Sequence, residues 1–178
     1  MLLLVGLGNP GSNYTNTRHN IGFKIIDAIN LHFKLSKQKP KFKGLLTTGN
    51  IESKKIYAIK PLTFMNNSGT AIKELIDYFK IDAKDVFVFH DDMDIDFGKI
   101  KTKFGGSSAG HNGIDSIDKF IGKDYSRVRV GIGHPKKRKK VNNHVLEDFK
   151  EDEEEKIKEI TDNIVKLIPI LIEKKIDL

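Results

Sequence analysis

Hydrophobic residues recur along the chain with two different spacings. In some segments they alternate with polar residues, which predicts strands, and in others they lie three or four residues apart, which predicts helices. Short apolar runs and two-residue alternation predict six strands, at residues 1–5, 42–51, 55–59, 86–90, 99–104 and 127–132. Apolar residues three or four apart predict helices at residues 21–33, from 67 or 68 to about 80, at 112–121 and from 151 to the end. This order predicts a single α/β domain over residues 1–178, with a mixed twisted β-sheet flanked by helices.

Individual residues refine the ends of these elements. Asn20 precedes the first helix, and its side chain is suited to cap that helix. Pro61 is expected to stop the strand before it. Pro169 is expected to kink or break the last helix, because proline lacks the backbone N–H that a helix interior uses.

The first predicted strand runs into a glycine-rich turn, Gly6-x-Gly8-x-x-Gly11, which has the spacing of a dinucleotide-binding motif. That motif requires a helix to begin at the glycines, so that backbone N–H groups face a pyrophosphate. Residues 11–17 (GSNYTNT) have no apolar period and favour turns. The nearest acidic residue at a suitable distance, Asp27, lies inside the predicted helix. We therefore reject the dinucleotide interpretation.

Charge is unevenly distributed along the chain, whose net charge is +7. Residues 147–178 contain eleven acids and six lysines, which leaves 25 bases against 13 acids in residues 1–146, a balance of +12. A basic body is typical of a protein with a polyanionic partner, although a solvated lysine-rich surface explains the same numbers. The run from Lys136 to Lys140 is interpreted as a basic loop.

Composition also excludes several classes of protein. The chain has no cysteine, so disulfides, thiolate metal sites and a thiol nucleophile are excluded. Apolar runs fall short of the ~20 residues that span a bilayer, and the first residues lack the basic segment of a signal peptide. We therefore expect no membrane association and a cytoplasmic location.

His19 is a candidate for chemistry because it follows a long polar loop and precedes a helix, where a side chain lies beside the end of a strand. A helix-capping histidine is the alternative. Asp91 follows the strand at residues 86–90, at the end where α/β sheets place their sites. It is expected either to orient a histidine or, with Asp92, to bind magnesium.

The acidic cluster after this strand does not fit a calcium loop. Asp92, Asp94 and Asp96 are spaced like the first ligands of an EF-hand, but that loop requires a glycine and a glutamate further on. The chain has Phe97 and Lys103 at those two positions. The EF-hand interpretation therefore fails.

Three asparagines occupy similar positions next to predicted strands or helices: Asn9, Asn66 and Asn112. An amide is neutral at every pH and both donates and accepts hydrogen bonds, so it can hold a water, a carbonyl or a peptide backbone. Taken singly, each is explained by the usual role of asparagine as a cap or turn residue.

Two predicted strands carry basic residues at alternate positions, so that their side chains project from one face. Lys101 and Lys103 form one pair, and Arg127 and Arg129 form the other. Such strands are suited to contact phosphates, and a solvated sheet face is the alternative.

Separated blocks of residues in this order carry a family resemblance. They are 5–11 (VGLGNPG), Tyr14 with 17–20 (TRHN) and Gly22, 63–66 (TFMN) with 68–69 (SG), 90–91 (HD) with Asp94, 105–106 (GG) with 110–113 (GHNG), and 127–135 (RVRVGIGHP). With these blocks the chain resembles the bacterial-type peptidyl-tRNA hydrolase family along nearly its whole length. The loop at residues 107–109 (SSA) departs from the family, whose members tend to have more glycine there.

The resemblance implies an activity and roles for the matching residues. The activity is hydrolysis of the ester between a peptide and the 3′ terminal ribose of tRNA, which releases tRNA for translation. His19 matches the general base that activates water, and Asp91 the carboxylate that orients it. Asn9 and Asn66 match amides of the catalytic site that bind the peptide and the 3′ end of the tRNA, and Asn112 matches the residue that positions the hydrolytic water or the substrate carbonyl. Tyr14 and Phe64 match further substrate-binding positions. The residues matching a grip on tRNA phosphates are Lys101, Lys103 and Arg129.

The resemblance further implies a monomer with a phosphorylase/hydrolase-like fold that needs no cofactor or metal and has peptidyl-tRNA as its partner. Two other classes remain open on the residues alone. One is a magnesium-dependent hydrolase or nuclease that uses Asp91, Asp92 and Asp94. The other is a non-catalytic RNA-binding domain, for which the basic body is sufficient.

Overall fold

The protein is described by a computed structural model that covers residues 1–135 and 141–174. The basic run at residues 136–140 lies outside these described residues. In the described part, seven strands form one sheet in the order β2-β3-β4-β1-β5-β7-β6. Their bounds are β1 Leu2–Gly6, β2 Lys39–Lys41, β3 Gly44–Ile51, β4 Lys54–Pro61, β5 Val86–Asp92, β6 Ile100–Phe104 and β7 Ser126–Gly131. The inner strands β4, β1, β5 and β7 are parallel, and the outer strands pair antiparallel, so the predicted mixed sheet is confirmed.

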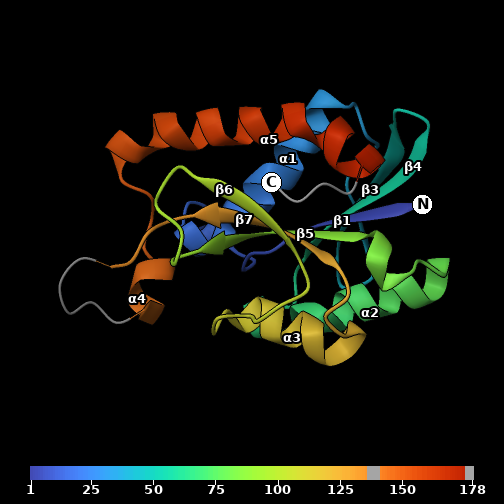
Figure 1. Ribbon diagram of the computed structural model, residues 1–178, viewed down its shortest axis with the longest axis horizontal. Helices are drawn as coiled ribbons and strands as arrows, with labels where there is room; N and C mark the ends of the chain where they lie inside the picture. The colour runs from blue at the N-terminus through green and yellow to red at the C-terminus, as the bar shows by residue number, and fades with distance from the viewer. Residues whose placement is uncertain (136–140, 175–178) are drawn as a thin grey trace.

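Helices cover both faces of this sheet (Figure 1). Helices α1 (Ile21–His32) and α5 (Glu154–Lys174) lie on one face, and α2 (Ser68–Phe79) and α3 (Asn112–Ile121) lie on the other. The short helix α4 (Val141–Val145) lies near the edge where the parallel strands end. No helix among the described residues is long and apolar enough to span a bilayer.

Each face of the sheet has its own hydrophobic core, because successive side chains of a strand point to opposite faces. In β1, Leu2 and Leu4 belong to the core under α1 and α5, whereas Leu3 and Val5 belong to the core over α2 and α3. Both faces of the inner strands are therefore buried, which explains why those strands read as continuous apolar runs.

The predicted helices and inner strands agree with the structure to within about three residues, which is the usual precision of such boundaries. The largest difference is at α5, which begins at Glu154 and not at residue 151. The strand predicted at residues 42–51 begins later, at Gly44. Phe42 and Lys43 instead have positive φ angles of 54° and 56° and form the two-residue turn between β2 and β3. The edge strand β2, which contains Pro40, was not predicted, and proline is tolerated there because one side of an edge strand is unpaired.

The two prolines have different outcomes. Pro61 is the last residue of β4, so the strand ends at this proline as predicted, and the proline itself still pairs with Gly44. Pro169 lies inside α5, which continues to Lys174, so the predicted break of this helix is wrong. The buried residues around it, Ile168, Leu171 and Ile172, pack on the sheet, and this packing keeps the segment helical.

The first turn of α1 packs directly against the ends of β1 and β5. A Cβ atom on Gly22 would overlap the backbone nitrogen of Leu7 and the carbonyl oxygen of Phe89. This close approach places the segment before α1, which contains His19, beside the end of β5.

We predict that Gly22→Ala destabilises the protein by about 1–3 kcal/mol, because the added methyl group meets rigid backbone. The measurement is urea unfolding followed by circular dichroism. Gly49→Ala is the matched control, since the nearest atom to its Cβ is the end of the Leu35 side chain, which can rotate away. Equal losses of stability in the two variants would contradict this account of Gly22.

Candidate active site

The site lies at the edge of the sheet where the parallel strands end. Chain segments that follow β1 and β4 meet there with the last residues of β5, since parallel strands end at the same edge. They carry Asn9, Asn66 and Asp91, which the sequence placed after predicted strands. His90 and Asp91 belong to β5 itself, which extends two residues beyond its predicted end.

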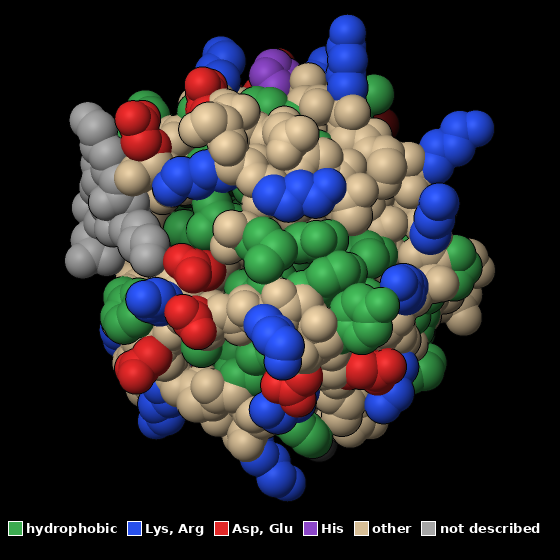
Figure 2. All heavy atoms as spheres, turned by 90° about the vertical axis from the view of Figure 1, so that its right-hand side faces the viewer, with side chains coloured by type: hydrophobic (Ala, Val, Ile, Leu, Met, Phe, Trp, Pro, Cys, Tyr) green, Lys and Arg blue, Asp and Glu red, His purple; other side chains and the backbone are tan. Residues whose placement is uncertain are grey.

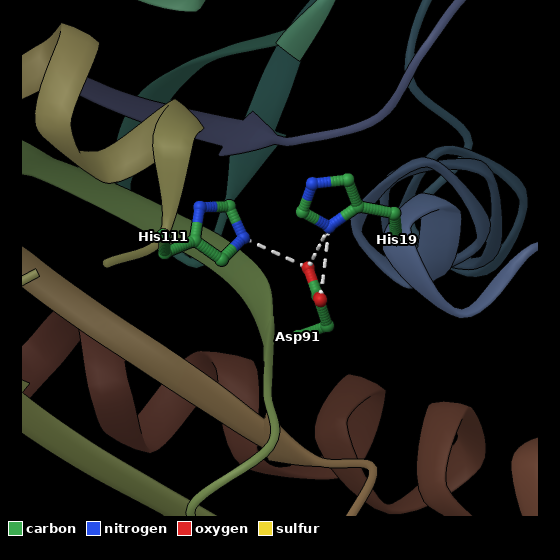
Figure 3. Close-up of side chains that lie close together, drawn as sticks. All are labelled: His19, Asp91 and His111. Atoms are coloured by element: carbon green, nitrogen blue, oxygen red, sulfur yellow. Dashed lines mark hydrogen bonds and ion pairs between the residues drawn. The ribbon is translucent and has the colours of Figure 1, made fainter. Parts of the chain in front are cut away.

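His19 and Asp91 are hydrogen-bonded to each other (Figure 3). His19 lies in a 3-10 turn, Arg18–Asn20, and its Nδ1 atom is 2.8 Å and 2.9 Å from the two carboxylate oxygens of Asp91. Both residues are buried. Because a carboxylate only accepts, Nδ1 carries the proton, and the lone pair of Nε2 is left on the other side of the ring.

His111 is a second partner of Asp91 and was assigned no role from the sequence. Its Nε2 atom lies 2.8 Å from Asp91 Oδ1, on the other side of the carboxylate from His19 (Figure 3). Its Nδ1 atom accepts hydrogen bonds from the backbone N–H groups of Gly113 and Ile114, so His111 is the N-cap of α3. Nδ1 is therefore unprotonated, and Nε2–H donates to Asp91.

The sequence offered one weak signal for this role. His111 directly precedes the predicted helix at residues 112–121, where a cap is expected, but histidine is not among the preferred N-cap residues. Its second contact, to Asp91, joins residues twenty positions apart and depends on the tertiary structure.

The ionisation of this cluster follows from its burial and its hydrogen bonds. Burial alone would raise the pKa of Asp91, but His19 and His111 hold that pKa well below its usual value of 3.8. Burial alone would lower the pKa of His19, but the charge and hydrogen bond of Asp91 raise it above 6.5. Asp91 is therefore ionised at neutral pH.

The sign of each shift determines its effect on stability. Because the pKa of His19 is raised in the folded protein, its protonation stabilises the folded state. This contribution is fully present below pH 6.5 and is lost as the pH rises through the pKa that His19 has in the folded protein. The lowered pKa of Asp91 contributes stability that is present above its unfolded pKa and is lost on acidification.

His90 lies beside the cluster and stays neutral. Burial, together with the nearby His111, lowers its pKa to about 3. Its Nδ1 atom donates to the carbonyl oxygen of Asp91 at 2.7 Å, and its ring meets His111 edge-on at 4.9 Å. His90 therefore supports His111 without adding charge.

Asn9 is held in place by Asn20, whose predicted role as the cap of α1 was wrong. The side chain of Asn20 binds the backbone N–H and the carbonyl oxygen of Asn9, each at 2.8 Å, and makes no capping bond. Asn9 Oδ1 in turn accepts from the backbone N–H of Met65 at 2.7 Å. The amide acceptor of Asn9 is thus used within the protein, and its NH₂ group is left to donate.

A groove next to His19 brings together six of the residues predicted for the site. Its lining includes Asn9, Tyr14, His19, Phe64, Asn66 and Asn112. Phe64 has φ 60° and ψ 157°, a conformation almost restricted to glycine, and its side chain is half exposed at 51%. Its ring meets Tyr14 edge-on at 6.4 Å, so two aromatic rings form one wall.

Helix α4 and the residue after it form another wall of the groove, and the sequence did not predict this helix. Asn142 and Val145 of α4 line the groove from this side, as does Leu146 directly after the helix. A second hollow also borders His19. It is lined by Asp92, Met93, Asp94 and the loop at residues 108–111, and again by Asn142 and Val145.

Strands β6 and β7 place basic side chains on one face, but not all of them are available to a ligand. Lys101 pairs directly with Arg129, and Lys103 with Arg127, across the two strands. Arg127 is buried, binds Asp118 at 2.8 Å and donates to the carbonyl of Ser107, so its predicted role in contacting phosphates was wrong. Lys101 is exposed, and Lys103 and Arg129 are half-buried.

Basic side chains are not confined to this part of the surface. The opposite end of the sheet, where the parallel strands begin, shows lysine and arginine side chains around a hydrophobic patch (Figure 2). Net charge by itself therefore does not locate a polyanion-binding surface. The basic side chains that bind a polyanionic substrate have to be identified by their position relative to His19.

The cluster of His19, Asp91 and His111 has the composition of a metal site, with ligand atoms within 4.8 Å of one another. Coordination by His111 would require a lone pair on Nε2. The two backbone N–H groups that bind Nδ1 keep the proton on Nε2, so this histidine is in the wrong tautomer to bind a metal. The donor set does not fit a metal ion.

The neighbouring carboxylates are likewise engaged within the protein. Asp92 accepts from the backbone N–H of Asp94 and lies 3.6 Å from Arg129. Asp94 lies 2.8 Å from Nε2 of His134. The geometry therefore gives no support to a magnesium site on Asp91, Asp92 and Asp94.

A model of the family described as "Peptidyl-tRNA hydrolase" matches residues 3–178. A protein of that name from Pelagibacter ubique (strain HTCC1062) is 71% identical over 178 residues, which is all of this chain and 96% of the relative. The chain belongs to the peptidyl-tRNA hydrolase family. Its relative from Bacillus subtilis (strain 168) is 44% identical over 93% of this chain and 89% of the relative.

Solved structures agree with this family membership. The crystal structure of peptidyl-tRNA hydrolase from Acinetobacter baumannii has a TM-score of 0.92 to this chain at 35% identity, over 98% of this chain and 90% of that one. The fold predicted from the resemblance is confirmed, and the activity of the family is hydrolysis of the ester in peptidyl-tRNA.

We predict that Asp91→Asn lowers the pKa of His19, because burial then acts without the opposing charge of the carboxylate. The measurement is a titration of the histidine ring protons by NMR. The wild-type protein should titrate above pH 6.5 at His19, and the variant should titrate at a lower pH. Asp94→Asn is the control, since Asp94 pairs with His134 and makes no contact with His19. An unchanged titration of His19 in Asp91→Asn would contradict the assigned pair.

Proposed function

We propose that His19 is the general base with which this member of the peptidyl-tRNA hydrolase family activates water. One observation carries the proposal: Asp91 binds Nδ1–H of His19 through both oxygens, which leaves Nε2 with its lone pair. No partner binds Nε2 within the described residues, and His19 lines the groove. A proton acceptor held in one tautomer and open to a groove is what water activation requires.

The reaction follows in two proton transfers. His19 takes a proton from water while the water oxygen attacks the ester carbonyl carbon, and a tetrahedral intermediate forms. The C–O bond to the ribose then breaks, and the imidazolium returns a proton to the ribose oxygen. The products are a peptide with a free carboxyl group and a tRNA with a free terminal hydroxyl. General base catalysis of this kind contributes about 10²–10⁴-fold.

Asp91 stabilises the imidazolium that forms on His19 and stays ionised throughout, as the acid of a serine-protease triad does. Its low pKa suits this role, because a carboxylate that took up the proton would not hold His19 in place. We propose that His111 holds Asp91 in position through Nε2–H.

Asn112 and Asn66 are proposed to donate to the oxyanion of the intermediate. Asn112 is the first residue of α3, at the positive end of the helix dipole, and its side chain borders the same groove as His19. Asn66 lies in the turn after β4 and lines that groove. One such donor is worth about 3–4 kcal/mol in known enzymes.

Neutral amides explain how the enzyme spares aminoacyl-tRNA. Asn9 presents only its NH₂ group, because Met65 occupies its oxygen, so it is suited to a peptide carbonyl. A free α-ammonium next to this donor would lose hydration without gaining an acceptor. Asn66 adds a second neutral group, and the rings of Tyr14 and Phe64 offer apolar surface to the substrate.

We propose that Lys101, Lys103 and Arg129 contact phosphates of the tRNA acceptor stem. These residues share one face of β6 and β7, and Arg129 is the direct neighbour of His90, one residue before Asp91. This face is thus continuous with the site. Phosphate contacts of this kind position the substrate and carry little sequence information.

The remaining features of the proposal come from the family resemblance. The reaction as written uses only side chains and water, so it needs no cofactor. The protein is proposed to act as a monomer in the cytoplasm, with residues 1–178 forming one domain.

We predict that His19→Ala lowers the hydrolysis of N-acetyl-aminoacyl-tRNA by at least about 10²-fold, because the base is removed. Binding of uncharged tRNA, measured by fluorescence anisotropy, should persist. His32→Ala is the control, since His32 is exposed at the end of α1 and should be dispensable.

The same assay with EDTA distinguishes the magnesium-dependent alternative. Activity of the wild-type protein should survive EDTA, because both oxygens of Asp91 are bound by His19. Loss of activity that magnesium restores, or near-normal turnover by His19→Ala, would overturn the proposal.

We predict that alanine at Lys101, Lys103 or Arg129 raises KM and flattens the dependence of kcat/KM on salt. The log–log slope should change by about one unit for each phosphate that the variant no longer neutralises. Lys55→Ala is the control, because this exposed lysine lies near the start of β4, at the opposite edge of the sheet. An unchanged slope in the three variants would show that these residues do not bind phosphates.

A further inference from the structure

Helix α4 presents one face to the site. Val141, Asn142 and Val145 of the helix, together with Leu146 directly after it, line the groove or the adjoining hollow. Their spacing of three and four residues is that of one helix face. Asn143 and His144 lie between them in the sequence and line neither one. The face is apolar except for Asn142.

Asn142 borders both parts of the site at once. Together with His19, Asn112 and Val145, it lines the groove that contains Asn9 and Asn66 as well as the hollow next to Asp91 and His111. Because these residues border both the groove and the hollow, they lie where the groove and the hollow meet, and His19 is one of them. A substrate group that binds Asn142 therefore lies next to the ester that is hydrolysed at His19.

The amide of Asn142 is free to bind a ligand. Its side chain is exposed, and its amide forms no hydrogen bond with another of the described residues. In contrast to Asn9, whose oxygen binds Met65, Asn142 retains both its acceptor and its donors.

Contacts on the far side of α4 hold the helix that carries Asn142 in place. The buried His144 lies with Nε2 at 3.0 Å from the carbonyl oxygen of Gly133, and the buried Arg18 donates to the carbonyl oxygen of His144 at 3.2 Å. Arg18 also forms an ion pair with Glu153 at 3.2 Å. Because Arg18 directly precedes His19, the wall that carries Asn142 is tied to the segment that carries the base.

We propose that Asn142 is a further substrate-binding residue, which hydrogen-bonds a neutral group attached next to the scissile ester. This proposal rests on the proposed function of the site. Two groups of the substrate have the required chemistry and position: the amide of the last peptide residue and the 2′-hydroxyl of the terminal ribose. Both are neutral and both donate and accept hydrogen bonds.

Asn142→Ala tests the proposal, with Asn143→Ala as the matched control one residue away. Both side chains are exposed, so neither substitution should change the melting temperature. We expect Asn142→Ala to lower kcat/KM for N-acetyl-aminoacyl-tRNA by about 3- to 10-fold, the effect of one neutral hydrogen bond. Asn143→Ala should match the wild-type protein.

A second substrate, with 2′-deoxyadenosine at the 3′ end, identifies the bound group. If the effect of Asn142→Ala disappears with this substrate, the contact is to the ribose hydroxyl. If the effect persists, the contact is to the peptide amide. Wild-type kcat/KM in Asn142→Ala on the unmodified substrate would overturn this inference and leave the role of His19 standing. Turnover by His19→Ala would instead overturn the proposed function.

Discussion

The carboxylate of Asp91 is buried at the end of β5, where an unpaired charge carries a large free-energy penalty. Its hydrogen bonds to His19 and His111 offset that penalty, and they tie together three segments: the turn before α1, the end of β5 and the start of α3. Removal of either histidine leaves a buried charge incompletely paired. The geometry of the site and the local stability of these segments therefore depend on the same contacts.

The two histidines differ because of what binds their other ring nitrogen. Backbone N–H groups of α3 occupy Nδ1 of His111, which makes it a fixed donor to Asp91 and unsuited to catalysis or metal binding. Nε2 of His19 has no such partner in the described residues and is left to act on water. Around them, contacts to backbone groups hold Asn9 through Asn20 and hold α4 through Arg18. Contacts to main-chain groups thus position Asn9 and α4 on either side of His19.

Much of the fold was predictable because burial on both faces makes the inner strands continuously apolar and the helices amphipathic. The errors occur where tertiary contacts outweigh local preference. Pro169 remains in a helix because its neighbours are buried, and Asn20 binds Asn9 instead of capping α1. Helix α4 is too short for its period to be recognised, and contacts from Arg18 and His144 hold it.

Local pattern was enough to establish the order of strands and helices and the edge of the sheet that carries Asn9, Asn66 and Asp91. Motifs along the chain were enough, by resemblance, to establish the family. Three further facts came from the folded arrangement alone: His111 shares Asp91 with His19, Arg127 is buried, and Asn142 borders the groove beside the base. These facts depend on contacts between residues distant in the sequence, whose separation in space no local pattern encodes.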